Sequence, residues 1–273
     1  MRITVLIENT APENLMCEHG LSFYIEFAGK EYLLDAGTTD LFLENAKRLG
    51  ISLQDVKKCI LSHGHYDHSG GFCELFDENT EANLYLMKGA TGDYYSIKGE
   101  LHEIGIPKEL LRKYKDRFVF IDRVTELDSN VYLVPHHSED LEQIGARAGL
   151  YKKIDDKLYP DDFIHELSLV FDTKEGLVVF NSCSHGGMKN ILKEVKEVFP
   201  EKNICAFIGG LHLKGGSFTK EEIQEIAVCG KSVGMKVLYT GHCTGEEAFE
   251  ILKKVDEGFI QKLFSGKVIE IDV

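Results

Sequence analysis

The chain of 273 residues has a formal net charge of −14, a hydrophobic content of 43% and seven cysteines. This length and apolar content suffice for one large α/β domain, and no run of eighteen apolar residues is present that could span a membrane. The acidic balance argues against a nucleic-acid partner because it repels phosphate backbones, but a small anionic substrate could still be held by a local positive site.

The N-terminal part predicts strands and one helix. Residues 1–8 are charged too early for a signal peptide and predict a first strand, so we expect a cytoplasmic protein whose scattered cysteines form no disulfide framework. Residues 21–27 alternate apolar and polar side chains, as in a strand with one buried face. A turn at 29–30 then leads into a strand at 31–35, and apolar residues recur at helical spacing over 40–49.

Three histidines and one aspartate crowd the loop that follows the apolar run 56–61. Imidazole nitrogen and carboxylate oxygen are ligands that suit zinc, and also iron and manganese. His63 and His65 lie two apart and would point the same way in extended chain, whereas Asp67 and His68 lie just beyond and could serve a second ion. A solvated polar turn is the alternative, but four such groups in six residues favour a metal site.

The pattern weakens over residues 89–162. It predicts a helix at 107–115 and strands near 118–121 and 131–134, with no clear metal spacing. We predict an insertion that caps the site and selects the substrate, with a surface elaboration as the alternative. His136, inside this range, is predicted to be solvated.

Regular structure resumes near residue 166. From there on, the same unit occurs three times: an apolar strand, then a loop of small residues and a histidine, then a helix. The strands are predicted at 177–181, 204–208 and 236–239, and the helices at 188–199, from 219 onward and at 246–255. Thr219 and Glu222 have the spacing of a capping box. Because functional groups gather at strand ends on one rim of a sheet, we expect His185, His212 and His242 to join the first cluster.

The motif His63-x-His65-x-Asp67-His68, preceded by the Leu33–Gly37 strand and turn, resembles the metal motif of the metallo-β-lactamase superfamily. The resemblance implies a single domain with a four-layer αββα sandwich and two divalent metal ions, which we predict to be zinc, with iron or manganese as alternatives. It also implies the ligands: His63, His65 and His185 for one ion, Asp67, His68 and His242 for the other, and Asp35 as a support of the metal loop.

One position departs from the superfamily pattern. A carboxylate usually bridges the two metals at the end of the strand that corresponds here to 177–183, and no Asp or Glu stands there. Cys183 could replace it as a thiolate, because a metal deprotonates a coordinating thiol. Alternatively, His165 is the ligand of the first metal, and Cys183 and His185 lie nearer the bridge.

Further segments are similar to the subgroup that contains the dihydropterin synthase of the methanopterin pathway; these segments are Glu18–Ser22, Cys183–His185, Gly209–Leu213 and Thr240–Gly245. Many relatives in this subgroup are described only as metal-dependent hydrolases, so membership does not fix the reaction. Because two metal ions can activate a water molecule, we expect a hydrolase that acts on a small, anionic or phosphorylated substrate. Asp67 would orient a group or accept a proton, His212 would bind substrate or donate a proton, and His19 would lie over the site. The alternatives are a transferase that releases diphosphate from a dihydropterin diphosphate, and a metal-binding sensor without catalysis.

Overall fold

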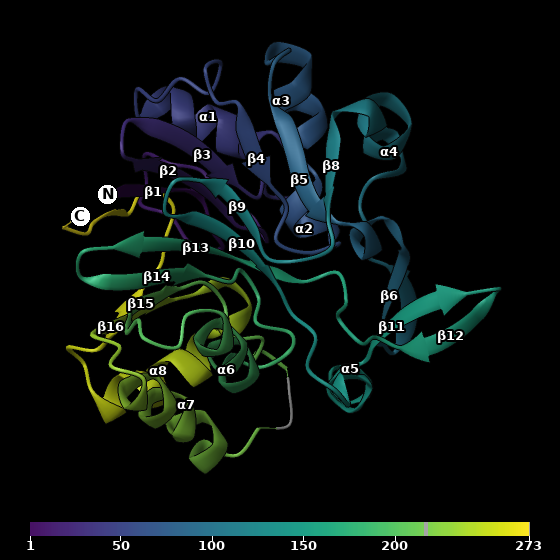
Figure 1. Cartoon of the computed structure of the whole chain (residues 1–273). Helices are drawn as coiled ribbons and strands as arrows, with labels where there is room; N and C mark the ends of the chain where they lie inside the picture. Colours follow the sequence, from purple (N-terminus) through teal and green to yellow (C-terminus); the bar gives the residue numbers. More distant parts are fainter. Residues whose placement is uncertain (216–217, 273) are drawn as a thin grey trace.

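The computed structural model describes residues 1–215 and 218–272, and Figure 1 shows two large sheets that face each other between two sets of helices. Apolar side chains fill the space between the sheets. Phe23 of the first sheet meets Phe180 of the second edge to face, with 5.6 Å between the ring centroids, and Phe171 packs beside them. The four-layer α/β sandwich predicted from the sequence is confirmed.

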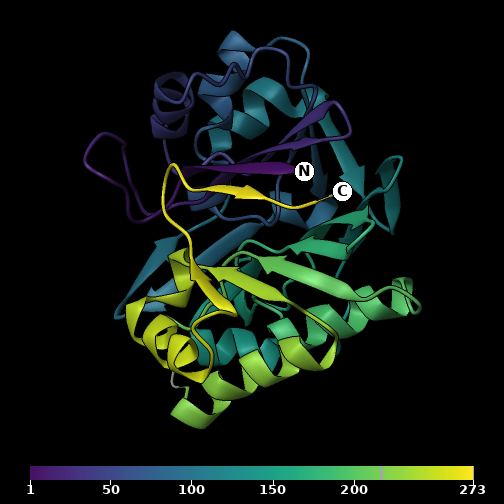
Figure 2. The ribbon, with the colours of Figure 1, turned by 90° about the vertical axis from the view of Figure 1, so that its left-hand side faces the viewer.

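Each large sheet contains seven strands. In spatial order the first sheet runs β18 (Val268–Glu270), β1 (Arg2–Ile7), β2 (Ser22–Phe27), β3 (Lys30–Leu34), β4 (Lys58–Ile60), β5 (Asn83–Met87) and β8 (Phe118–Ile121). The second runs β17 (Ile260–Lys262), β16 (Val237–Thr240), β15 (Ile204–Ile208), β14 (Gly176–Phe180), β13 (Leu167–Thr173), β10 (Val131–Pro135) and β9 (Thr125–Asp128). Figure 2 shows β18 (yellow) beside β1 (purple), with which it pairs antiparallel. Strands from the two ends of the chain thus form one edge of the first sheet.

Parallel strands occupy one half of each sheet. They run from β3 to β8 in the first sheet and from β14 to β17 in the second. Loops that follow parallel strands leave the sheet at the same edge. The loops after β4, β14, β15 and β16, which carry the candidate site residues, are therefore brought to a common rim.

Helices cover the outer face of each sheet. The first sheet carries α1 (Leu41–Arg48), α3 (Phe72–Glu78) and α4 (Lys108–Tyr114), and the second carries α6 (Met188–Val198), α7 (Lys220–Ser232) and α8 (Glu246–Val255) (Figure 1). The other helical segments are α2 (Tyr66–Ser69), α5 (Leu141–Ala148) and the 3-10 turns η1 (Lys88–Thr91), η2 (Lys115–Arg117) and η3 (His242–Thr244). The apolar stripe of α6, with Ile191, Leu192 and Val195 buried, shows how such a helix attaches. Within the described residues, no helix is both long and apolar enough to cross a bilayer.

Local sequence signals predicted the start of α7 and the turn between β2 and β3 to within one residue. The Thr219 hydroxyl accepts a hydrogen bond from the Glu222 N–H at 3.1 Å, and the Thr219 N–H donates to the Glu222 carboxylate at 2.6 Å, so the predicted capping box is confirmed. The turn between β2 and β3 lies one residue earlier than predicted. Ala28 and Gly29 both have positive φ, as a two-residue type I′ turn requires, and Lys30 already belongs to β3.

The range 89–162, predicted as one insertion, is divided in the structure. β8 belongs to the first sheet, and β9 and β10 belong to the second. A separate four-stranded sheet is formed by β12 (Lys157–Pro160), β11 (Leu150–Ile154), β6 (Asp93–Lys98) and β7 (Glu100–Glu103). This small sheet and α5 stand beside the two large sheets in Figure 1, and we call them the side unit. The side unit is thus narrower than the predicted insertion.

His136 follows β10 and is buried, so the prediction of a solvated histidine is wrong. Its Nε2 lies 2.7 Å from the Ser168 hydroxyl, and its Nδ1 lies 2.6 Å from the Glu194 carboxylate. The prediction failed because it placed this residue in a surface insertion, whereas β10 is an inner strand between β9 and β13.

Candidate metal centre

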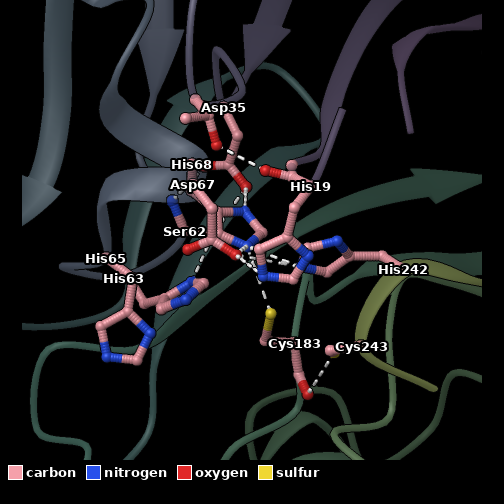
Figure 3. A network of polar contacts seen from close by, with 12 residues as sticks. His19, Asp35, Ser62, His63, His65, Asp67, His68, Cys183, His242 and Cys243 are labelled. Atoms are coloured by element: carbon pink, nitrogen blue, oxygen red, sulfur yellow. Dashed lines mark hydrogen bonds and ion pairs between the residues drawn. The ribbon is translucent and has the colours of Figure 1, made fainter. Parts of the chain in front are cut away.

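Seven potential metal ligands meet at the common rim, and each is less than a tenth exposed. They are His63 and His65 after β4, Asp67 and His68 on α2, Cys183 and His185 after β14, and His242 after β16. Figure 3 shows His68 and His242 beside the sulfur of Cys183. The structure therefore brings together the six residues expected as ligands from the resemblance.

The first group consists of His63, His65 and His185. Their ring centroids lie 4.6 to 4.8 Å apart. Among the described residues, the Nε2 atoms of His63 and His65 and both ring nitrogens of His185 are buried without a hydrogen-bond partner. Burying a polar atom without a partner costs about 1–3 kcal/mol, so several such atoms at one place need an electrophile to accept their lone pairs.

Burial lowers the pKa of each of these three histidines. The neighbouring imidazoles lower the pKa values of His63 and His185 further, and that of His65 falls to about 3. The rings are consequently neutral at pH 7, which is the form that binds a metal ion.

The second group pairs His68 with His242, whose Nε2 atoms lie 3.2 Å apart. The Nδ1 of His68 donates to the Asp35 carboxylate at 2.8 Å, and the Nδ1 of His242 lies 2.9 Å from Asn9 Oδ1. Asn9 Oδ1 also accepts the Gly20 N–H, which identifies it as an acceptor, so His242 Nδ1 is the donor. When both rings are neutral, the two Nε2 atoms therefore present lone pairs to each other. Two nitrogen atoms bound to one tetrahedral zinc ion, at about 2.0–2.1 Å each, lie about 3.3 Å apart.

A proton can occupy the space between the two Nε2 atoms when no metal ion does. Burial disfavours the charged form of His68, but the carboxylates of Asp67 and Asp35 outweigh burial and raise its pKa to about 9. An Nε2–H of His68 would then donate to His242. Metal binding has to displace that proton, which is the usual coupling between a metal and a titratable ligand.

Asp67 completes the second group. Its Oδ2 lies 3.4 Å from His242 Nε2 and 3.7 Å from His68 Nε2. His19, half exposed, places its Nε2 3.2 Å from the same oxygen and stacks on the His242 ring at 5.0 Å. His19 thus covers this group from the solvent side, where the sequence analysis expected it.

Cys183 lies between the two groups. Its sulfur is 3.2 Å from His68 Nε2, and it lies within 4.8 Å of the ligand atoms of both His63 and His185 and of both His68 and His242. Burial raises the pKa of this thiol well above its usual range, so the thiolate forms there when a cation stabilises it. The sulfur thus stands within reach of both groups, where the superfamily usually has a bridging carboxylate.

Asp35 supports both groups at once. It accepts the Ser62 N–H at 2.8 Å on one oxygen, and on the other it accepts the Ser62 hydroxyl at 2.7 Å and His68 Nδ1 at 2.8 Å. The Ser62 oxygen lies in turn 2.8 Å from His63 Nδ1. Because the Ser62 hydroxyl hydrogen goes to Asp35, His63 Nδ1 is the donor in that contact, and its Nε2 lone pair points away from it.

His165, the alternative ligand, has both ring nitrogens engaged. Its Nδ1 accepts the Gly64 N–H at 3.0 Å, and its Nε2 donates to the Asp161 carboxylate at 3.0 Å. The arrangement favours His185 over His165 as the ligand, because His185 has free lone pairs. His165 instead holds the loop between His63 and His65 in place.

Sequence reasoning missed three groups that hold the loops. The Glu8 carboxylate accepts the His242 N–H at 2.6 Å, and Asn9 orients the ring of the same histidine. The buried Glu166 accepts the N–H groups of His185 and Gly186 at 2.8 and 3.1 Å. The position of Glu8 and Asn9 directly after the first strand was a usable signal, since other site residues also follow strands.

Four residues of the site have a strained backbone. Asp35, Ser184, His212 and His242 all have φ between +48° and +60°, a region that non-glycine residues seldom adopt. Such strain persists where the surroundings over-determine the conformation, commonly at functional sites. His212 lies with its ring centroid 4.3 Å from that of His185, and its Nδ1 is buried with no hydrogen-bond partner among the described residues.

The four-layer sandwich and the candidate ligands at its rim are typical of a class of metal-dependent proteins, and comparison with known proteins identifies the family. Residues 16–187 match the family model of the metallo-beta-lactamase superfamily, and the chain belongs to this superfamily.

Several known proteins match over nearly the whole chain. The chain is 30% identical to the 7,8-dihydropterin-6-methyl-4-(beta-D-ribofuranosyl)-aminobenzene-5'-phosphate synthase of Methanocaldococcus jannaschii, over 99% of this chain and 96% of that protein. The crystal structure of Tm1679, described as a metal-dependent hydrolase of the beta-lactamase superfamily, superposes with a TM-score of 0.86 at 32% identity over the full length of both chains. A diphosphatase from the PhnP family matches with a TM-score of 0.57 at 14% identity, over 100% of this chain and 98% of that one, which shows the shared fold alone.

Proposed function

We propose that the protein is a metal-dependent hydrolase with a dinuclear centre. His63, His65 and His185 would hold one divalent ion, Asp67, His68 and His242 the other, and Cys183 would contact both. The observation that carries this proposal is the set of buried imidazole nitrogens without partners, beside the 3.2 Å contact between two Nε2 atoms.

The donor set suits zinc, which takes imidazole, thiolate and carboxylate ligands, whereas iron and manganese are the alternatives. When bound, a pair of such ions lowers the pKa of water toward neutrality and polarises the bond under attack. A small anionic substrate fits this chemistry in a chain whose net charge is −14. Cytoplasmic location and the lack of a nucleic-acid partner remain parts of the proposal.

The remaining residues would handle substrate and protons. Asp67 would orient the attacking group or accept its proton, with His19 in contact with the same oxygen. His212, beside His185 and with a free Nδ1, would bind the substrate or donate a proton to the leaving group.

The experiment combines metal analysis with a substrate panel. Protein purified without chelators should contain close to two ions per chain, and His63→Ala should lose metal and turnover of phosphoester, thioester or lactone substrates. His102→Ala, at an exposed position of β7, is the matched control. Protein that neither contains nor takes up divalent ions would refute the proposal, and metal-replete protein inactive toward the whole panel would favour the sensor.

A second candidate is a transferase that releases diphosphate. It is supported by the 30% identity to a protein named as a synthase, over 99% of this chain. Release of diphosphate from a dihydropterin methyl diphosphate, dependent on the amine co-substrate, would favour this reaction over hydrolysis.

A further inference from the structure

A cavity of about 360 Å³ opens beside the metal centre, with His185 and His212 in its wall. Helix α5 and the end of β6 line it from the side unit, and α6, α7 and the loops after β14 and β15 line it from the second sheet. Cavities of this size that carry a few polar groups are the usual form of a small-molecule site. Its position puts any occupant next to the unpartnered nitrogen atoms of His185.

Most of the cavity wall is apolar. Ile144 and Ala148 of α5 contribute from one side, and Leu213, Phe218 and Ile226 contribute from the other. Ile144, Ala148, Phe218 and Ile226 are partly exposed, so their apolar surface is free to cover a ligand. A flat ring or another apolar group would gain the most from this wall, because removing apolar surface from water favours the complex.

The same cavity carries unpaired positive charge. Lys98, Lys189 and Lys214 line it, and within residues 1–215 and 218–272 none of these ammonium groups has a carboxylate within 4 Å. Two acids also line the cavity. Glu222 is engaged by Arg147 at 3.2 Å, whereas Glu225 has no ion-pair partner among the described residues and offsets one of the three positive charges. Three ammonium groups without carboxylate partners at one opening, in a chain with a net charge of −14, form a local attraction for an anion.

Arg147 connects the two sides of the cavity. Its guanidinium joins α5 to the Glu222 carboxylate of α7 and lies over the Phe218 ring, 4.4 Å from the centroid. The ion pair therefore links the side unit to the helices of the second sheet across the cavity. A wall held in this way is suited to select a ligand by shape.

Resting on the proposed function, we infer that this cavity binds the body of the substrate, and that the substrate is an aromatic or similarly flat apolar molecule with an anionic group. The ring lies between α5 and α7, the lysines hold the phosphate or carboxylate, and the reacting bond reaches His185 and His212. The side unit is then the part of the chain that determines substrate choice.

The test uses the metal-loaded full chain and three unreactive probes. Naphthalene-1-sulfonate has the ring and the anion, 1-naphthalenemethanol has the ring alone, and methanesulfonate has the anion alone. Binding of all three probes is followed by isothermal titration calorimetry, because its signal does not depend on the tryptophan that some variants below introduce. We expect naphthalene-1-sulfonate to bind at least tenfold more tightly than either of the other two.

Variants then separate the two halves of the site. Removing two lysines, with Lys189→Ala and Lys214→Ala combined, should weaken naphthalene-1-sulfonate about tenfold and 1-naphthalenemethanol less than twofold. Lys193→Ala, one turn further along α6, pairs with Glu197 and is the matched control. Ala148→Trp should abolish binding of both ring probes, and Ile226→Trp gives a second way to fill the cavity if the first variant unfolds.

The outcomes are distinguishable from failure of the proposed function. Unchanged naphthalene-1-sulfonate affinity in both the lysine and the tryptophan variants would overturn the inference, even if the protein is an active hydrolase. Lysine-dependent binding that is blocked by tryptophan would support the inference even in protein that hydrolyses nothing.

Discussion

Asp35→Asn tests how the metal centre is supported. The Asp35 side chain is fully buried and accepts three hydrogen bonds: two from Ser62 and one from His68 Nδ1. An asparagine of the same shape has one acceptor oxygen and one amide that donates. Whichever way the amide is oriented, its NH₂ group then faces another donor, either the Ser62 N–H or the His68 Nδ1–H.

The magnitude follows from these contacts. A hydrogen bond to a charged group contributes about 1.5–3 kcal/mol. At 1.4 kcal/mol for each tenfold change, its loss corresponds to a drop of about 10- to 150-fold in metal affinity. Loss of a residue that orients metal-binding histidines typically lowers affinity about 10- to 100-fold. Because Asp35 contacts His68 directly and His63 through Ser62, we expect both ions to be bound more weakly.

The assay is competition for zinc with a chromophoric chelator, with thermal unfolding followed in parallel to confirm that the variant is folded. Ser62→Ala should weaken the ion bound by His63 more than the other ion, since His68 keeps its contact with Asp35. Asp77→Asn, an exposed carboxylate that accepts from Lys113, is the control. Two zinc affinities in Asp35→Asn equal to those of the unmodified protein would refute the reasoning.

Three further predictions concern other parts of the molecule. Cys183→Ser should remove the thiolate-to-metal charge-transfer absorption of cobalt-loaded protein, while the buried Cys205→Ser retains it; absorption that survives in Cys183→Ser would exclude this ligand. Burial alone would raise the pKa of Glu194, but hydrogen bonds from His136 and neighbouring groups outweigh burial and lower this pKa. The Glu194 carboxylate therefore stabilises the fold at pH values above its ordinary pKa of 4.5. This contribution is lost as the pH falls through the lowered pKa of the folded protein. Glu194→Gln should therefore cost unfolding free energy at pH 7 and much less in acid, and an equal loss at both pH values in urea titrations would contradict this account. Leu192→Ala, which empties a fully buried position on α6, should lower the free energy of unfolding by about 2–5 kcal/mol in the same titrations.

Features set by neighbouring residues were predictable from the sequence. The capping box at Thr219 and the apolar stripe of α6 depend on spacings of three or four residues, and both are present in the structure. The crowding of His63, His65 and His68 is likewise a local fact, and it indicated the position of the centre before any fold was known.

Features set by distant pairing were not predictable in the same way. Periodicity does not state which sheet a short strand joins, so β8, β9 and β10 were assigned to an insertion. Glu8 lies 234 residues from His242, and no spacing rule connects a carboxylate after the first strand to a backbone N–H near the other end. Chain order does not distinguish His165 from His185 as a candidate ligand, because both residues come after the first histidine cluster. Only the structure shows that both ring nitrogens of His165 already have hydrogen-bond partners.

The contact between Glu8 and His242 has a consequence for the order in which the parts of the candidate site form during protein synthesis. A ribosome releases the first strand long before it releases the loop after β16, and β18, which also pairs with the first strand, comes later still. In the proposed dinuclear centre, His63 and His185 would therefore leave the ribosome before His242, and the group around His242 would be completed last. Cation loading during synthesis would then proceed from one side of Cys183 to the other.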